Sequence, residues 1–108
     1  MDASEVIKLI KITYTKDDYG VSRKQETARQ VYVQVDSVTQ SEFFQAGANG
    51  LKPEYRFTMF RYDYDKETIV EYDRDRYSVY RTYIQRKDII ELYVTKDKGV
   101  QNGGNNST

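Results

Sequence analysis

The chain has 108 residues, with 17 basic and 17 acidic residues, no cysteine and no histidine. This length allows one domain with a modest core, and the missing cysteines exclude disulfides and thiolate chemistry. The missing histidines remove the commonest general base and transition-metal ligand. We therefore expect no enzyme, no catalytic residue, no cofactor and no metal site.

The charges are interleaved rather than segregated, whereas free-standing nucleic-acid-binding proteins usually carry a basic excess. Residues 1–5 lack the basic start and apolar core of a signal peptide, and the apolar clusters are too short to cross a bilayer. We expect a soluble protein made in a cytoplasm, with no membrane partner.

In chain order, alternating apolar and polar residues predict a first strand over Val6–Thr15. An Asp-rich turn follows, and the polar segment Val21–Thr27 could be an extended hairpin arm. The next strand, Gln30–Val38, places valines on one face. They are candidates for the core: Val31, Val33 and Val35.

The alternation then stops. Thr39 and Glu42 have the spacing of a capping box, with Thr39 as the N-cap and the Glu42 side chain reaching back to it. Gly47 is placed to end the helix, which should be about two turns long. The residues that follow, up to Glu54, form a loop with Asn-Gly and the sole proline as breakers.

Three further strand segments follow: Tyr55–Asp63, a hairpin over Thr68–Tyr83, and Ile89–Thr95. Ile69 and Val79 are further candidates for the core. Such short strands should close into a small all-β barrel, with one short helix and a long loop inserted between strands 2 and 3. The barrel domain is expected over residues 1–98, and a disordered polar tail over residues 99–108.

Two patterns allow more than one interpretation. Asp63, Asp65 and Glu67 alternate and could bind a divalent cation, but a solvated turn explains them more simply. Tyrosines on both faces of 77–83 could stack on bases, as in oligonucleotide-binding barrels, or contact a protein partner. Without a basic patch, protein contact is the better interpretation. We expect all the carboxylates in turns or on solvent-facing strand positions, where nothing would perturb a pKa.

The order of these elements, with 41-SEFFQA-46, 51-LKPEYR-56, 69-IVEY-72, 77-YSVYRTY-83 and 90-IELYV-94, resembles the head-closure proteins of tailed bacteriophages, also called head–tail adaptors, connectors or stoppers. The resemblance covers about Val6 to Lys98. In one place the sequence departs from the family, whose tight hairpin usually turns at Asp-Gly. Here the turn is Asp73-Arg74-Asp75-Arg76, so we expect a longer loop.

The resemblance implies a structural virion protein at the head–tail interface, assembled in the host cytoplasm as a dodecameric ring. It would lie below a portal or adaptor ring and above a tail terminator or tail protein, with packaged double-stranded DNA passing through it without sequence specificity. The excursion from Gln40 to Glu54 would gate the DNA channel, whose loop residues would be Gln40, Ser41, Glu42, Phe43, Phe44, Gln45, Asn49, Lys52 and Glu54. Subunit or partner contacts are expected at Tyr80, Tyr62 and Tyr64. The alternative function is a small nucleic-acid-binding barrel module.

Overall fold

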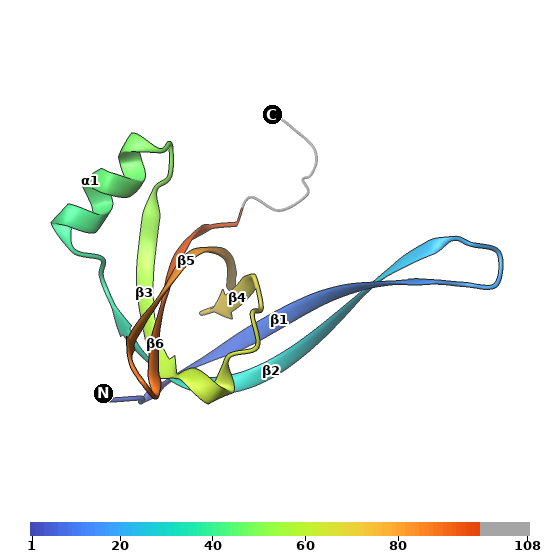
Figure 1. Cartoon of the computed structure of the whole chain (residues 1–108), viewed down its shortest axis with the longest axis horizontal. Coiled ribbons are helices and arrows are strands. Elements are labelled where there is room, and N and C mark those ends of the chain that lie inside the picture. Colours follow the sequence, from blue (N-terminus) through green and yellow to red (C-terminus); the bar gives the residue numbers. More distant parts are fainter. Residues whose placement is uncertain (98–108) are drawn as a thin grey trace.

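Six antiparallel strands close into a barrel in the computed structural model, which describes residues 1–97 (Figure 1). Around the barrel the strands follow the order β1-β2-β3-β6-β5-β4. The elements are β1 (Glu5–Lys16), β2 (Ser22–Asp36), α1 (Gln40–Ala48), β3 (Pro53–Phe60), η1 (Arg61–Asp63), β4 (Ile69–Tyr72), β5 (Asp75–Arg86) and β6 (Ile89–Lys96). The predicted all-β class, with one helix between strands 2 and 3, is therefore confirmed. The predicted tail, 99–108, lies outside the described residues.

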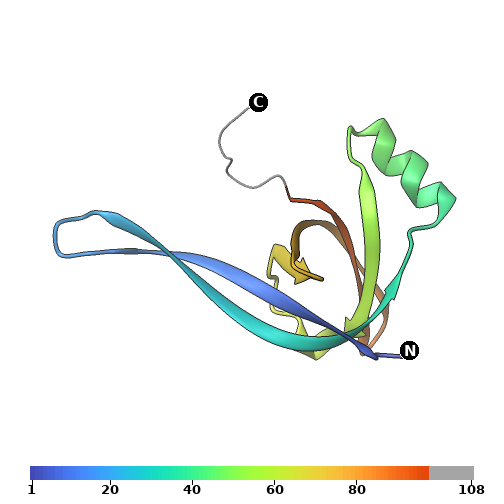
Figure 2. The ribbon, with the colours of Figure 1, turned by 180° about the vertical axis from the view of Figure 1, so that it is seen from behind.

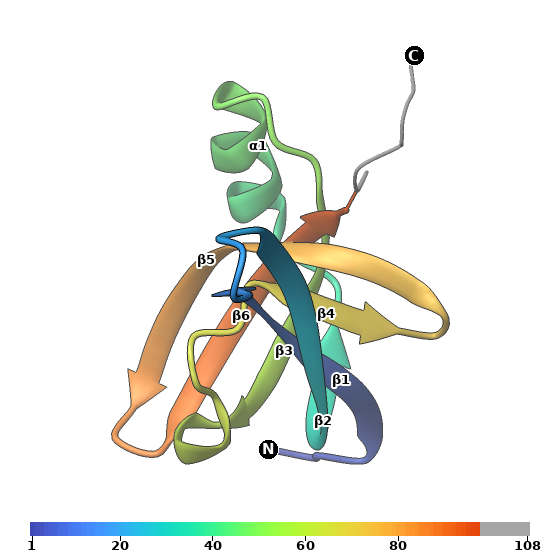
Figure 3. The ribbon, with the colours of Figure 1, turned by 90° about the vertical axis from the view of Figure 1, so that its right-hand side faces the viewer.

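The barrel interior is filled by the inward-facing side chains of all six strands, which curve around it in Figure 3. Val31 and Val33 are buried as predicted, and Val35 and Val79 pack against the same core. The prediction for Ile69 is wrong, because its neighbour Val70 is the buried residue. Val70 lies beside Leu9 and Tyr77 in the core, whereas Ile69 pairs with Ile10 on the other face.

Strands β1 and β2 extend far beyond the barrel as a two-stranded ribbon (Figures 1 and 2). They pair with each other from Glu5↔Val33 to Lys16↔Ser22. Their other neighbours are short: β4 pairs only with Lys8–Ile10 of β1, and β3 only with Gln34–Asp36 of β2. We call residues 11–27 the arm and residues 17–21 its tip. The sequence predicted an arm over 21–27 but divided what is one continuous strand, β2.

Helix α1 begins and ends at defined caps. The Thr39 hydroxyl accepts a hydrogen bond from the Glu42 N–H at 3.1 Å, so the predicted N-cap is confirmed. The predicted stop at Gly47 is wrong, because the helix runs on to Ala48. Gly50 follows with φ +78°, and the Leu51 N–H bonds to the Ala46 carbonyl at 2.9 Å. This is a Schellman ending, in which glycine adopts the left-handed conformation at low cost.

Two local expectations in the second half of the chain are also corrected. β3 ends at Phe60, and a 3₁₀ turn replaces the expected continuation to Asp63. The β4–β5 turn is tight rather than long: Tyr72 pairs with Asp75, and Asp73 and Arg74 have φ of 51° and 71°. An aromatic cluster fixes this register, since Tyr55 packs edge-on against Tyr72 and Tyr77 with ring centroids 5.3 and 5.4 Å away.

Candidate functional site

The helical excursion between β2 and β3 is fastened to the barrel through one carboxylate. Glu42 of α1 accepts a hydrogen bond from the Tyr80 hydroxyl at 2.7 Å and forms an ion pair with the Arg81 guanidinium at 2.5 Å. The sequence predicted that the Glu42 side chain would reach back to the helix N-terminus. Instead it is committed to β5. We call Glu42, Tyr80 and Arg81 the latch.

A β-bulge in β5 allows neighbouring residues to reach the same carboxylate. Val79 pairs with Val94 of β6 and Arg81 pairs with Tyr93, so Tyr80 is the extra residue between them. Successive side chains of a regular strand point to opposite faces, and a bulge re-aims them locally. The irregular pairing therefore brings Tyr80 and Arg81 together beneath α1.

The latch shifts the pKa values of its members in the directions that favour it. Burial alone would raise the pKa of Glu42, but hydrogen bonds from Arg81 and Tyr80 outweigh it and lower the pKa below the ordinary value. Burial, together with the hydrogen bond to Glu42, raises the pKa of the Tyr80 hydroxyl. The hydrogen bond to Glu42 raises the pKa of Arg81. The latch is therefore a charged pair with a neutral phenol donor at neutral pH.

The latch continues across the outer surface of the barrel. The Arg81 guanidinium lies 4.0 Å from the centre of the Tyr93 ring, in cation–π geometry. The Tyr93 hydroxyl in turn donates to the buried Glu91 at 2.6 Å, and the Gln85 amide donates to the other Glu91 oxygen at 2.8 Å. Arg81 is thus held from two sides and presents a fixed partner to Glu42.

Beside the latch, α1 and the barrel border an open pocket of about 300 Å³. Its apolar lining comes from Ala46 and Leu51, at the C-terminal end of the helix, and its polar lining includes Gln45 and Asn49. Ala46 is the only buried apolar residue of α1. The helix is therefore attached by the latch and its chain ends more than by apolar packing.

The other predicted channel residues lie on the outer surface of the excursion. Phe43 and Phe44 are exposed, Phe44 at 64%, and their rings meet edge-on at 6.2 Å. Most of the remaining residues are also exposed, namely Gln40, Ser41, Gln45, Asn49 and Lys52, while Glu54 is half-buried. Glu42 differs from the rest of the predicted set, because it faces the barrel.

The three predicted contact tyrosines do not form one surface. Tyr80 belongs to the latch, whereas Tyr62 and Tyr64 follow β3 in the segment 61–68. Tyr62 is exposed, and the Tyr64 hydroxyl donates to the Glu67 carbonyl at 2.7 Å. Tyr62 and Tyr64 line a second cavity with Ile84 and Ile90. This cavity shares no lining residue with the pocket beside the latch.

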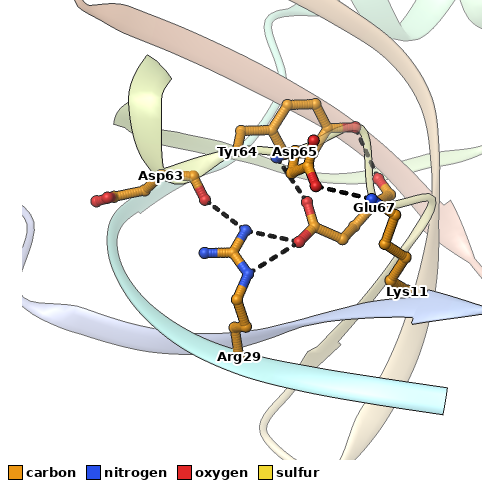
Figure 4. A network of polar contacts seen from close by, with 6 residues as sticks. All are labelled: Lys11, Arg29, Asp63, Tyr64, Asp65 and Glu67. Carbon is orange, nitrogen blue, oxygen red and sulfur yellow. Dashed lines mark hydrogen bonds and ion pairs between the residues drawn. The ribbon is translucent and has the colours of Figure 1, made fainter.

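The alternating acidic residues 63, 65 and 67 contact Lys11 of β1 and Arg29 of β2, which we call the arm base (Figure 4). Glu67 is 2% exposed and receives Arg29 Nη2 at 2.6 Å and Nε at 3.2 Å. Asp65 receives Lys11 Nζ at 2.7 Å, and the Asp63 carbonyl also accepts from Arg29. In residues 1–97 no group of three or more His, Cys, Asp or Glu side chains is placed to hold a metal ion.

The interpretation that every carboxylate faces solvent is wrong. Glu42, Glu67 and Glu91 are all buried, and each is satisfied by side-chain donors. A sequence signal existed for only one of them, since Glu42 stands in the first turn of a capped helix. The partners Arg81 and Arg29 are 39 and 38 residues away from Glu42 and Glu67, and no local pattern identifies them.

Neither a protein-family model nor a curated protein matches this chain. Within residues 1–97, no helix is long and apolar enough to span a membrane.

Proposed function

We propose that this protein is a structural component of a phage head–tail connector, not an enzyme. In this proposal it forms a dodecameric ring in the virion, below the portal or adaptor ring and above a tail terminator or tail protein, and double-stranded DNA passes through its lumen. The observation that carries the proposal is the attachment of α1. A closed barrel carries a helical excursion that is held by a small polar latch and displays two phenylalanines to the outside.

Such an excursion can move without unfolding the barrel. The latch bonds and the few apolar contacts of α1 would break, while the strand ladders of β3, β5 and β6 would stay paired. Elements that gate a passage are of this kind: a rigid scaffold and a hinged segment of lower local stability.

The charge of the excursion supports transit rather than capture of DNA. Its charged residues are Glu42, Lys52 and Glu54, and Glu42 is already paired with Arg81. One cation and one anion remain for the lumen. Because phosphate neutralisation supplies most non-specific DNA affinity, such a surface holds DNA weakly and lets it pass.

The test uses phage particles assembled with altered protein. In one variant the segment 46–51 is shortened, which removes the Schellman ending and restricts α1. The barrel should stay folded and the ring should still form, while particles lose packaged DNA or fail to join tails. A matched variant carries Lys87→Gln, an exposed change in the β5–β6 turn outside the excursion that leaves the latch and the ending intact, and its particles should remain infectious.

Two results would contradict the proposal. If the protein does not co-purify with portal and tail proteins in intact particles, it is not a connector component. If shortened-loop particles keep their genomes and infect normally, the excursion only caps the barrel. Binding of free oligonucleotides that weakens steeply with salt would instead favour the nucleic-acid-binding alternative.

A further inference from the structure

The tip of the arm is a hydrogen-bonded turn that exposes an acidic and an aromatic side chain. Asp17 Oδ1 accepts from the backbone N–H groups of Tyr19 and Val21, both at 2.9 Å, and its Oδ2 lies 3.4 Å from Arg23. These bonds hold the turn in one shape. Tyr19 is left 91% exposed, and within residues 1–97 Asp18 forms no hydrogen bond or ion pair.

Among residues 1–97, no other segment covers this tip. The arm leaves the barrel on the side away from α1 (Figures 1 and 2). In the described part of the chain, the side-chain hydrogen bonds and ion pairs of residues 12–25 stay inside the arm. The Tyr19 ring is thus 91% exposed at the end of a projecting ribbon, and tyrosine is among the residues that most often anchor protein interfaces.

A complementary cavity lies in the barrel wall. β4 pairs with β5 only as far as Ser78, although β5 runs on to Arg86. The segment 61–68 covers the rest of β5 incompletely and leaves a cavity of about 450 Å³. We call it the wall cavity, and its lining includes Arg61, Tyr62, Tyr64, Lys66, Thr82 and Ile84.

The wall cavity complements the arm tip in charge and in apolar lining. Two cations, Arg61 and Lys66, stand among aromatic and aliphatic side chains, and no carboxylate contributes to the lining. Asp65, beside Lys66, is turned to Lys11 of the arm base. The volume falls in the range of cavities that hold small ligands, about 300–1,000 Å³, and exceeds the need of one tyrosine ring.

We infer that the arm tip of one copy of this chain docks into the wall cavity of a second copy. Tyr19 enters between Tyr62 and Ile84, and Asp18 faces Arg61 and Lys66. Tip and cavity are different surfaces, so the contact is head-to-tail and leaves a free tip and a free cavity at the two ends of any pair. Such contacts close into rings when the rotation between copies permits. The inference rests on the proposed ring and specifies which surfaces of neighbouring copies meet.

Disulfide trapping with the purified full chain tests the contact, because the native sequence has no cysteine. One variant carries Val21→Cys at the tip, and the other carries Thr82→Cys in the wall cavity. A disulfide needs the two Cα atoms within about 7 Å, so it reports close approach. Mixed at high concentration under oxidation, the pair should form the mixed dimer at least about tenfold faster than a control pair of Thr13→Cys and Thr82→Cys.

Variants of the tip and of the cavity distinguish specific docking from random collision of the two cysteines. In the Val21→Cys chain, Tyr19→Ser or Asp18→Lys should reduce the rate to that of the control pair. Lys66→Glu in the Thr82→Cys chain should restore trapping of the Asp18→Lys tip. Equal rates for the two cysteine pairs, or rates unchanged by Tyr19→Ser and Asp18→Lys, would overturn the inference. Because no particle is present, trapping can succeed even if the protein proves absent from virions, and it can fail even if the protein is found there.

Discussion

At the scale of single residues, the latch concentrates much of the attachment of α1 in Glu42. We predict that Glu42→Gln lowers the free energy of unfolding by about 2 kcal/mol, the usual contribution of hydrogen bonds to a buried charged group. Arg81 would lose its counter-charge and Tyr80 its anionic acceptor. Chemical denaturation at neutral pH measures the change. Glu54→Gln is the matched control, since Glu54 has the same chemistry on the same excursion but lies outside the latch.

The latch also predicts a direction for acid destabilisation. The pKa of Glu42 is lower in the folded chain than its ordinary value of 4.5. Its contribution is therefore complete above the unfolded pKa and is lost as the pH falls through the folded pKa. The stability difference between wild type and Glu42→Gln should be constant near neutral pH and shrink below about 4.5. A difference that grows with acid would contradict the ion pair as the source of the stability.

At the scale of elements, the β4–β5 turn carries identifiable strain. Asp73 and Arg74 both adopt positive φ, which glycine and asparagine tolerate better than arginine does. We predict that Asp73→Asn with Arg74→Gly raises the free energy of unfolding by about 1 kcal/mol. The same dipeptide at Lys87–Asp88, a turn without positive φ, should bring no gain. Denaturant midpoints of the two variants measure the difference.

These elements also show how much of the fold could be predicted from the sequence. The strand alternation and the Thr39 cap predicted the barrel and its helix, because both signals are local and have a fixed period. Ile69 and Val70 are both apolar, so the local pattern could not choose between them, and the partners Leu9 and Tyr77 set the register. The tight β4–β5 turn was missed for a similar reason, since aromatic packing between distant strands overrides turn preference.

The candidate site was less predictable than the fold. The excursion and its exposed phenylalanines could be identified from the break in strand rhythm. The latch could not, because it depends on a bulge at Tyr80 that arises only when β5 and β6 pair. The wall cavity likewise exists because β4 ends early relative to β5, and neither strand reveals the other's length.

At the scale of the whole molecule, one segment touches both the arm and the wall cavity, which are the two parts that the inferred contact between copies uses. Segment 61–68 binds the arm base through Asp65 and Glu67 (Figure 4). The same segment lines the wall cavity with Tyr62 and Lys66. A tip seated in the cavity would therefore press on the residues that orient the occupied molecule's own arm. Each contact could thus bias the direction of the next.

The lengths of strand pairing also differ around the barrel. The β1–β2 ribbon is joined to β4 by three residue pairs and to β3 by three, whereas β3 and β6 pair along most of their length. Local unfolding should therefore begin where β1 pairs with β4 and where β2 pairs with β3, so that the ribbon is released as a unit before the other strands unfold. In native-state amide hydrogen exchange, the β1–β4 and β2–β3 amides should lose protection well before those of β3 and β6. Uniform protection around the barrel would show instead that the six strands open together, leaving the ribbon no independent freedom to swing.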